Sequence, residues 1–261
     1  MTINIINHSI LKKTENQLKY TPRHLINNQQ KIIEIFNDIA PTYNISNRII
    51  SLGLDKKWRR DICKLALECV ESSSTLEIAD IACGTGDMLY FWQQALASRK
   101  ISANIIGIDP SANMLKIAHQ DYPNITTVHS GVDSLPLENE SVDIVSIAFG
   151  LRNMVEQQDA LAECHRVLKK GGLFVCLEFL RDDSEHLMHR AKNYYINQIL
   201  PIIGGLIAKN RPAYEYLAQS VQNFSSEKEL LGSLKDSHFE VLYAESTWLD
   251  VSHKIIARKS T

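Results

Sequence analysis

A short turn that contains two glycines, within residues 76–87, constrains the fold of this chain more than any other stretch of its sequence. The stretch reads Leu-Glu-Ile-Ala-Asp-Ile-Ala-Cys-Gly-Thr-Gly-Asp, and a helical pattern follows it. An apolar run that ends in an acidic residue and glycines predicts a strand, a tight turn and the start of a helix. In open α/β sheets, ligands bind at such turns, outside the carboxyl ends of parallel strands.

Two common nucleotide-binding loops do not match this turn. A dinucleotide fingerprint, G-x-G-x-x-G, needs a third glycine, and that position is Leu89. A Walker loop needs Gly-Lys followed by Ser or Thr, which this turn lacks. The turn instead resembles the acidic-x-x-x-G-x-G loop of S-adenosylmethionine (SAM) methyltransferases, a resemblance that implies SAM as the cofactor.

Strand-like and helix-like segments alternate from residue 76 onwards. The expected strands cover residues 76–81, 104–108, 125–129, 142–147, 173–179, 238–247 and 252–258. The expected helices cover residues 87–98, 111–119, 156–168, 184–199, 201–208, 212–222 and 226–236. Such alternation is typical of a doubly wound, mostly parallel sheet. We therefore predict an α/β fold with a Rossmann-like sheet of seven strands, whose last two strands form an antiparallel edge.

The same patterns predict how the chain is divided. Residues 1–28 show no sustained period and are expected to form a flexible N-terminal arm, whereas residues 29–261 form a single domain. Within it, residues 29–70 form a helical cap, and residues 184–236 form a helical lid or insertion before the last two strands. In the cap we expect one helix from Gln29 to Ala40, which Pro41 ends. Two further cap helices are expected over residues 46–52 and 56–70.

Composition argues against several classes of partner. The formal net charge is −2 and 22% of residues are charged, so no nucleic-acid partner is expected. The five cysteines are scattered without metal-ligand spacing, so no metal site is expected, and unpaired thiols favour a cytoplasmic location.

The apolar content gives a separate expectation about membranes. No uncharged apolar run reaches the length of a spanning helix. The uncharged run at residues 194–208 fits two interpretations, which are packing within the insertion and peripheral contact with a membrane surface. The sequence leaves open whether the chain forms a homodimer.

Acidic residues at strand ends extend the cofactor prediction. Asp109 ends the second strand, where a carboxylate can accept from both ribose hydroxyls, and the alternative is a helix N-cap. Asp80 and Asp87 flank the turn, and one of them would hold the amino-acid end of the cofactor. Asp133 would reach an adenine amine, unless it belongs only to a surface turn. The predicted cofactor-binding set is Asp80, Cys83, Gly84, Thr85, Gly86, Asp87, Asp109, Val132, Asp133 and Ala148.

The fourth expected strand runs into residues 149–153, Phe-Gly-Leu-Arg-Asn. An arginine at the C-terminal end of this strand, Arg152, would point into the same crevice as the cofactor. It would bring five hydrogen-bond donors and a permanent charge there. The alternative is that Arg152 pairs with a neighbouring carboxylate such as Glu178.

Several separate blocks resemble the ubiquinone/menaquinone biosynthesis C-methyltransferase family, over about residues 35–220. The matching positions of its N-terminal signature are Phe36, Ala40, Tyr43, Asn47, Ser51, Gly53 and Trp58. The other matching blocks are residues 80–87, 149–153 and 177–179, Leu200, Pro201, Gly204, Tyr214, Tyr216, Leu217 and Ser220. The glycine turn by itself indicates only a methyltransferase, whereas the N-terminal signature and residues 149–153 together are specific.

The resemblance implies methylation of a ring carbon of a polyprenyl benzoquinol or naphthoquinol, a lipophilic aromatic molecule such as demethylmenaquinol or a ubiquinone precursor. It also implies catalytic roles for three residues. Arg152 would stabilise the developing oxyanion or orient a water that takes the proton, Asn153 would fix the ring hydroxyl, and Tyr43 would close over the site from the cap. Two rival functions remain, which are methylation of another small aromatic or polyketide-like acceptor and a non-catalytic scaffold of the same fold.

The chain departs from the family pattern in four places. Asn44 and Gln219 replace acids, Ala148 replaces a serine, and residues 247–254 lack the usual glycine-rich strand with its histidine. Loss of the hydroxyl at Ala148 predicts altered cofactor affinity. The C-terminal change predicts a different acceptor or a different partner contact.

Overall fold

The computed structural model describes residues 23–70, 75–181, 211–247 and 252–260. Within these ranges lies a seven-stranded sheet in the order β3-β2-β1-β4-β5-β7-β6. Its strands are β1 (Leu76–Ile81), β2 (Ala103–Asp109), β3 (Thr126–His129), β4 (Val142–Ala148), β5 (Leu168–Glu178), β6 (Phe239–Ser246) and β7 (His253–Lys259). Strands β1 to β5 pair in parallel, and β7 runs antiparallel to both β5 and β6. The predicted doubly wound sheet with an antiparallel edge is therefore confirmed.

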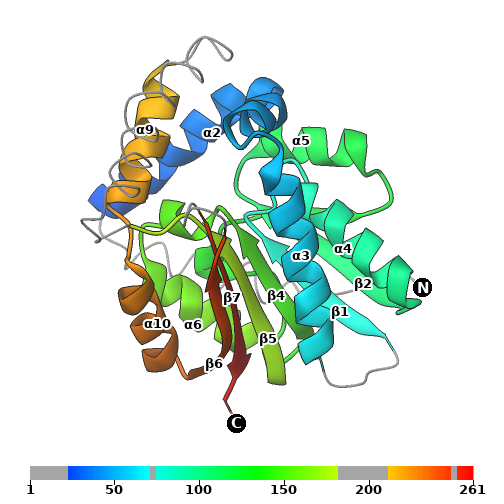
Figure 1. Cartoon of the computed structure of the whole chain (residues 1–261). Coiled ribbons are helices and arrows are strands. Elements are labelled where there is room, and N and C mark those ends of the chain that lie inside the picture. The colour runs from blue at the N-terminus through cyan, green and yellow to red at the C-terminus, as the bar shows by residue number, and fades with distance from the viewer. Residues whose placement is uncertain (1–22, 71–74, 182–210, 248–251, 261) are drawn as a thin grey trace.

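Helices cover both faces of the sheet and one of its ends (Figure 1). They are α2 (Arg23–Ile50), α3 (Leu54–Cys69), α4 (Asp87–Arg99), α5 (Ala112–Asp121), α6 (Gln157–Val167), α9 (Arg211–Gln222) and α10 (Glu227–Asp236). Two single turns of 3-10 helix are η1 (Val132–Ser134) and η2 (Leu151–Asn153). Helices α2 and α9 lie above the sheet in this view. The helices expected at residues 184–199 and 201–208 lie outside the described residues.

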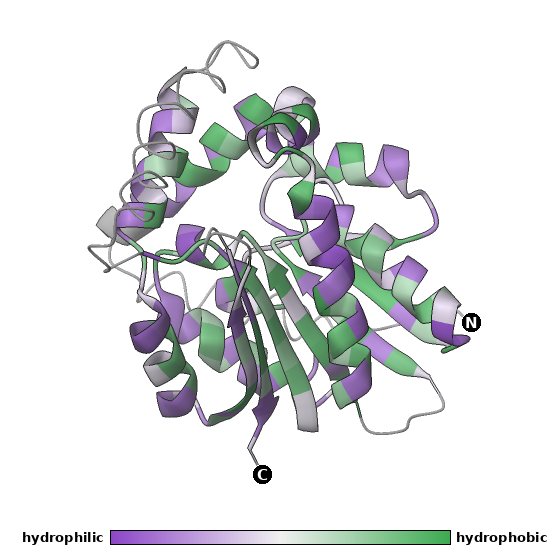
Figure 2. Cartoon of the chain, viewed as in Figure 1, coloured by the Kyte–Doolittle hydropathy of each residue, from purple (hydrophilic) through white to green (hydrophobic). Residues whose placement is uncertain are grey.

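The strands are apolar on both faces because each face is covered by helices. In β1, Leu76 and Ile78 belong to a buried cluster with Trp92 of α4, whereas Ala79 and Ile81 belong to a cluster on the opposite face. This follows from the alternation of side chains along a strand. Figure 2 shows the result, with mostly apolar strands inside and hydrophilic residues on the outer sides of the surrounding helices. The site therefore rests on a scaffold that is buried on both sides.

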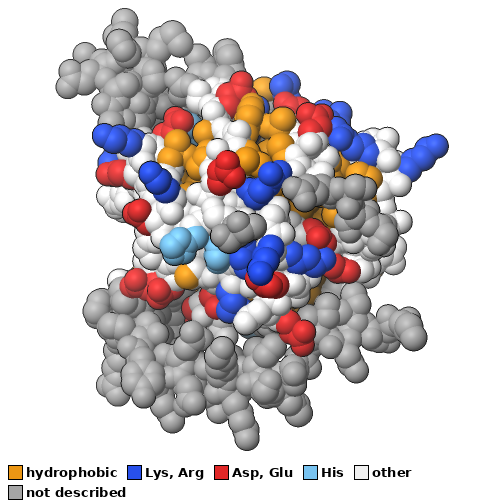
Figure 3. All heavy atoms as spheres, turned by 90° about the horizontal axis from the view of Figure 1, so that it is seen from below, with side chains coloured by type: hydrophobic (Ala, Val, Ile, Leu, Met, Phe, Trp, Pro, Cys, Tyr) orange, Lys and Arg blue, Asp and Glu red, His pale blue; other side chains and the backbone are white. Residues whose placement is uncertain are grey.

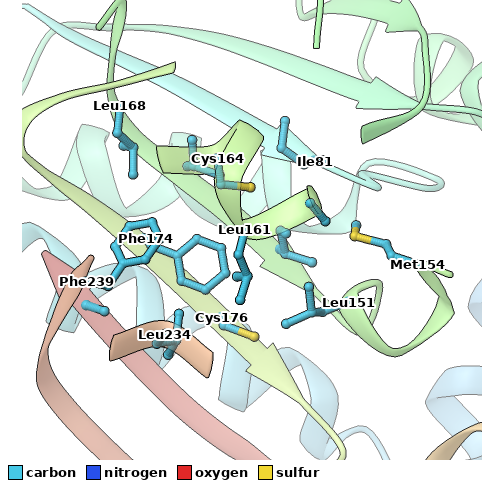
Figure 4. Packing of buried hydrophobic residues seen from close by; sticks show 14 of the residues in the cluster. Ile81, Leu151, Met154, Leu161, Cys164, Leu168, Phe174, Cys176, Leu234 and Phe239 are labelled. Carbon is cyan, nitrogen blue, oxygen red and sulfur yellow. The ribbon is translucent and has the colours of Figure 1, made fainter. Parts of the chain in front are cut away.

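The cluster under α6 and α10 joins distant parts of the chain (Figure 4). Phe174 of β5 and Phe239 of β6 have ring centroids 5.4 Å apart, and Leu161 and Leu234 belong to the same cluster. Full burial of a side chain of this size stabilises the fold by about 1.5–3 kcal/mol. This packing holds the antiparallel edge against the parallel part of the sheet.

The cap helix differs from the sequence prediction, because α2 is one continuous helix that contains Pro41. It also begins at Arg23, inside the range expected to form an arm. A proline within a helix cannot donate to the carbonyl four residues earlier. That carbonyl belongs to Asn37, and it accepts instead from Nδ2 of Asn113 on α5 at 3.1 Å. The expected helix end at Pro41 is wrong because a tertiary contact satisfies the acceptor that the proline leaves open.

Strand β5 also differs, because it begins at Leu168 and not at residue 173. We expected Gly171 and Gly172 to form the turn from helix to strand. They lie within the strand instead, where its register with β4 shifts. Gly171 has φ +73°, and a Cβ at Gly172 would lie 2.9 Å from the Lys169 carbonyl oxygen. The two glycines therefore form a bulge, which the sequence pattern does not distinguish from a turn.

The surface of the described residues gives no sign of a single dominant charge on the face shown in Figure 3. Lys and Arg side chains there lie interspersed with Asp and Glu side chains. None of the described helices combines the length and apolar character needed to cross a bilayer. The run at residues 194–208, where we expected membrane contact, lies outside the described residues.

Candidate active site

The turn between β1 and α4 has the conformation that its glycines predict. Ala82, Gly84 and Gly86 have φ values of +54°, +55° and +88°. A Cβ at Gly86 would lie 2.7 Å from the Tyr122 ring, so packing requires glycine there. Nothing lies within 4 Å of the position of a Cβ at Gly84. The backbone at Gly84 is therefore open to the approach of a ligand.

A small pocket lies against this turn, at the point where the strand order reverses between β1 and β4. Its lining comes from α2, α3, the end of β1, the turn, the start of α4 and the end of β4. The lining residues are Tyr43, Arg59, Asp80, Ala82, Cys83, Gly84, Thr85, Asp87, Met88 and Ala148. The fold thus brings Tyr43 and Ala148 to the turn from distant parts of the sequence. Open α/β sheets bind ligands at this topological switch point.

Asp80 is the most deeply buried acidic group of the pocket, with 1% of its surface exposed. Its Oδ1 accepts from Ser146 Oγ at 2.6 Å, and Ser146 Oγ accepts from Trp92 Nε1 at 2.9 Å. Its Oδ2 has no hydrogen-bond partner among the described residues. Burial raises the pKa of Asp80 to about 7. A buried carboxylate oxygen without a donor is an attractive partner for a cationic group.

Asp109 lies beside the turn at the end of β2. Its Oδ2 accepts from the Gly84 backbone N–H at 2.8 Å, and its Oδ1 accepts from the Ser111 N–H at 2.7 Å. The N-cap of α5 is Ser111, whose Oγ accepts from the Met114 N–H, so Asp109 is not the cap. Burial raises the pKa of Asp109 to about 6. Each carboxylate oxygen can accept a further hydrogen bond, which leaves Asp109 able to bind a ribose. The ribose contact itself stays a prediction.

Val132 and Asp133 lie in η1 and do not line the pocket. Asp133 is exposed, and Val132 is half-buried against the core. The Asp133 carboxylate lies over Gly131 and occupies the space that a side chain there would need. The contact between Asp133 and an adenine amine stays a prediction.

The turn is fastened to the cap helix through Thr85. The Thr85 hydroxyl donates to Asn44 Oδ1 at 2.6 Å, and Thr85 is almost fully buried. Asn44 stands where the family pattern has an acid, and its amide still supplies an acceptor oxygen. Cys83, next to Gly84, is buried, and burial raises its pKa far above the usual range, so its thiol stays protonated.

Four charged side chains that the sequence analysis did not place together form a network of ion pairs beside the pocket, where α2 and α3 meet the start of α4. Asp55 accepts from Arg48 and, at 2.8 Å, from Arg59. Asp87 accepts from Arg48 Nη2 at 2.6 Å, and Arg59 Nη2 lies 4.0 Å from its Oδ2. Arg48 and Asp55 occupy positions of the N-terminal signature at which any residue is allowed, and Arg59 directly follows its last residue, Trp58. Only the i, i+4 spacing of Asp55 and Arg59 could have indicated a pair.

Arg152 lies in η2, one turn beyond β4, and its side chain is 5% exposed. Its Nη1 donates to Glu178 Oε1 at 2.5 Å and to the Phe149 carbonyl at 2.8 Å, and its Nε donates to Ser220 Oγ at 3.2 Å. The alternative interpretation, an ion pair with Glu178, is therefore confirmed. Arg152 does not line the small pocket. Its role in catalysis stays a prediction.

Asn153 and Tyr43 were predicted to complete the acceptor site. Asn153 is buried, its Nδ2 donates to the Phe149 carbonyl at 3.3 Å, and its Oδ1 accepts from Tyr216 of α9 at 3.1 Å. Tyr43 lines the pocket from α2 and packs edge-to-face with Phe36. Helix α9 thus orients both Arg152 and Asn153. No group of three or more potential metal ligands occurs within the described ranges.

Solved structures share the fold of this chain. One is a SAM-dependent methyltransferase from Thermotoga maritima, with a TM-score of 0.57 and 19% identity over 88% of this chain and 100% of that one. Another is a SAM-dependent methyltransferase from Aquifex aeolicus, with a TM-score of 0.53 and 16% identity over 76% and 89% of the two chains. These likenesses show that the chain has the fold of solved methyltransferases.

Comparison of sequences identifies the family. The model of the ubiE/COQ5 methyltransferase family matches residues 24–254. The ubiquinone/menaquinone biosynthesis C-methyltransferase UbiE of Campylobacter jejuni is 47% identical over 88% of this chain and 98% of its own length. A demethylmenaquinone methyltransferase of Thermotoga maritima is 33% identical over 81% and 89%. The chain belongs to the ubiE/COQ5 methyltransferase family, as the sequence blocks predict.

Proposed function

We propose that this enzyme transfers a methyl group from SAM to a ring carbon of a polyprenyl benzoquinol or naphthoquinol in quinone biosynthesis. The printed names of its relatives support the acceptor class. The observation that carries the proposal is the path of the chain after β4, which leads from the pocket at Ala148 to the predicted acceptor residues Arg152 and Asn153 in η2.

The residues present fit SAM. The open backbone at Gly84 and the unpartnered Oδ2 of Asp80 suit a ligand that carries a cationic group. Asp109 would hold the ribose and Asp133 the adenine. When bound, SAM supplies a methyl group on a sulfonium, which is already a strong electrophile. The protein then has to align the acceptor, exclude water and stabilise the charge on the ring oxygen.

Arg152 is held firmly enough to serve as a fixed donor. Glu178, Phe149 and Ser220 each accept a hydrogen bond from its guanidinium, so no reorganisation is needed when the ring hydroxyl loses its proton. Such preorganised donors stabilise an oxyanion strongly in a dry site. Asn153 uses one Nδ2–H on the Phe149 carbonyl. Its second N–H would donate to the ring oxygen, and Tyr43 would cover the ring from α2.

A methyl-transfer assay with labelled SAM tests this proposal. The acceptors are demethylmenaquinol and a demethylated ubiquinol precursor, with catechol as a water-soluble control. We expect a carbon-methylated product from at least one quinol and none from catechol. SAM binding without transfer to either quinol would contradict the proposal and favour the scaffold. An oxygen-methylated catechol would favour the other class of acceptor.

Variants of Arg152 separate chemistry from cofactor binding in the same assay. Arg152→Lys keeps a positive charge beside Glu178 but loses the fixed geometry of the guanidinium. We expect turnover to fall roughly 10²–10³-fold, by analogy with the loss of one oxyanion donor, while SAM affinity is retained. Arg60→Lys, an exposed change on α3, is the matched control. Normal turnover in Arg152→Lys removes Arg152 from the mechanism.

We further propose that the enzyme works in the cytoplasm at a membrane surface, with residues 194–208 as the contact segment and no nucleic-acid partner. A polyprenyl tail dissolves in lipid, so contact with the bilayer would bring the enzyme to its acceptor. Flotation with anionic vesicles tests this, and protein that stays at the bottom of the gradient contradicts it. Sedimentation of the same sample distinguishes a monomer from a homodimer.

A further inference from the structure

Helix α9 presents two hydroxyl groups, one helical turn apart, to consecutive residues of η2. The Tyr216 hydroxyl donates to Oδ1 of Asn153 at 3.1 Å. The Ser220 hydroxyl accepts from Nε of Arg152 at 3.2 Å and itself donates to the Leu217 carbonyl at 2.8 Å. The guanidinium of Arg152 has further partners, whereas Oδ1 of Asn153 has Tyr216 as its one donor among the described residues. The direction in which the Asn153 amide points therefore depends on Tyr216.

The two ends of the Asn153 amide are told apart by their partners. Its Nδ2 donates to the Phe149 carbonyl at 3.3 Å, and a carbonyl can only accept, so the nitrogen end must lie there. The oxygen end then faces Tyr216, which supplies a proton. Burial raises the pKa of Tyr216 to about 12, so its hydroxyl keeps that proton at physiological pH. With Oδ1 occupied, the amide still has its second N–H to donate.

We propose that Tyr216 is a positioning residue for methyl transfer, because it occupies Oδ1 of Asn153 and leaves the amide with only an N–H to offer the ring oxygen of the acceptor. This inference rests on the proposed function and adds Tyr216 to the residues that serve it. A donor stabilises the ring oxygen once that oxygen carries charge. A free amide oxygen would instead accept from the ring hydroxyl and favour its protonated form, in which the ring carbon is a poorer nucleophile.

The backbone of Asn153 is held independently of Tyr216. Its carbonyl accepts from Nε2 of Gln29 on α2 at 3.4 Å, and Oε1 of Gln29 accepts from the Val155 N–H at 3.1 Å. Its own N–H donates to the Gly150 carbonyl at 3.0 Å. Loss of the Tyr216 hydroxyl should therefore leave η2 in place and release only the side-chain oxygen. Asn153 is 7% exposed, so that oxygen would need a new donor within the site.

Tyr216→Phe removes the hydroxyl and keeps the ring, so it tests this inference with labelled SAM and demethylmenaquinol. We expect kcat to fall about 5- to 30-fold, the effect of leaving one buried acceptor unpaired. The KM for the quinol and the Kd of S-adenosylhomocysteine, the demethylated cofactor, should stay within about twofold, because the Asn153 bond strengthens only as charge develops. Tyr214→Phe is the matched control, since its buried hydroxyl lies on the same helix and has no hydrogen bond to η2 among the described residues. It should leave all three values unchanged.

A double-mutant cycle separates positioning from a general structural role. If Tyr216 acts through Asn153, then Tyr216→Phe should lower kcat no further once Asn153→Ala has removed the amide. An equal fall in both backgrounds, an unchanged kcat in Tyr216→Phe, or wild-type turnover in Asn153→Ala overturns the inference. If Asn153→Ala does not fold, the split between kcat and KM in Tyr216→Phe decides, and a joint loss of both overturns it. If wild type methylates no quinol, the proposed function itself is wrong and the inference falls with it.

Discussion

Phe149 and Phe179 stack with ring centroids 4.5 Å apart and an interplanar angle of 25°. A guanidinium group also lies over each ring. The guanidinium carbon of Arg59 is 4.9 Å from the centroid of Phe149, and that of Arg152 is 5.3 Å from the centroid of Phe179. Phe149 has φ +62°, a conformation that costs energy in any residue other than glycine. The two rings therefore link the proposed cofactor end of the site to its proposed acceptor end.

Phe149→Leu should weaken both ends of the site at once. The change keeps an apolar side chain but removes the stacking and the cation–π contact, together worth about 1–2 kcal/mol of unfolding free energy. We expect turnover to fall with stability. Phe91→Leu is a matched control, because Phe91 is equally buried in α4 and contacts Arg60 away from the pocket. Urea unfolding and turnover are measured for both, and an unchanged turnover in Phe149→Leu contradicts the link.

The buried pair of Arg152 and Glu178 makes a second prediction, on stability. Glu178 is fully buried, so Arg152→Met leaves an uncompensated charge in the core. We expect this single change to cost about 3–5 kcal/mol of unfolding free energy. The double variant Arg152→Met, Glu178→Gln should recover most of that loss because it removes both charges. Guanidinium unfolding measures both, and a double variant no more stable than the single one would refute this account.

The two glycines of the turn should respond differently to alanine. Both have positive φ, so each substitution costs about 1 kcal/mol through backbone strain. Gly86→Ala also drives a methyl group into the Tyr122 ring, and we expect its thermal stability to fall further. Gly84→Ala meets no protein atom, so it should keep most of its stability but lose affinity for S-adenosylhomocysteine. Equal effects of the two changes on stability and affinity would contradict this division.

The raised pKa values predict how stability depends on pH. Burial raises the pKa of Asp80 to about 7 and that of Asp109 to about 6, both above the ordinary value of 3.8. At a pH between 3.8 and the raised pKa of each group, the folded state holds a proton that the unfolded state has lost. The stabilising contribution is thus full below about pH 4 and is lost as pH rises through 7. Unfolding free energies from about pH 5 to 8 should fall less in Asp80→Asn than in wild type, and parallel profiles would disprove the assignment.

The contact between Thr85 and Asn44 predicts which changes the cap tolerates. Thr85 needs only an acceptor oxygen on α2, at 2.6 Å in this structure. Asn44→Asp supplies one and restores the acid of the family pattern, so we expect normal cofactor affinity. Asn44→Ala leaves a buried hydroxyl unpaired, at a cost of about 1–3 kcal/mol. Calorimetric binding and thermal melts compare the two, and a loss as large in Asn44→Asp as in Asn44→Ala would contradict this view.

Local patterns allowed the sequence to predict the sheet and the turn. The glycines and acids of residues 80–87 act within one turn of chain, so their spacing alone indicates their structure. Pro41 and Gly171 were interpreted by the same local rules, and there the prediction was wrong. In each case a partner distant in sequence decides the outcome, namely Asn113 of α5 for the cap helix and β4 for the bulge.

Charged partners were harder to predict than backbone structure. The pairing of Arg152 with Glu178 was foreseen only as an alternative, because nothing local shows which carboxylate a strand-end arginine will meet. Arg48 and Arg59 were missed altogether, since Arg59 lines the pocket and Arg48 contacts Asp87 only after α2 and α3 fold across the turn. For Asp133, the position in the sequence suits a contact with adenine, but its surroundings in the structure do not test that contact.

The hydrogen bonds that join Trp92, Ser146 and Asp80 have a practical consequence. The indole N–H of a fully buried tryptophan lies two hydrogen bonds from a carboxylate whose pKa is about 7. A change of charge at Asp80, whether from protonation or from a bound cation, acts on the indole through this short relay. The fluorescence of Trp92 should follow that change, which gives the protein a built-in optical probe of its own pocket.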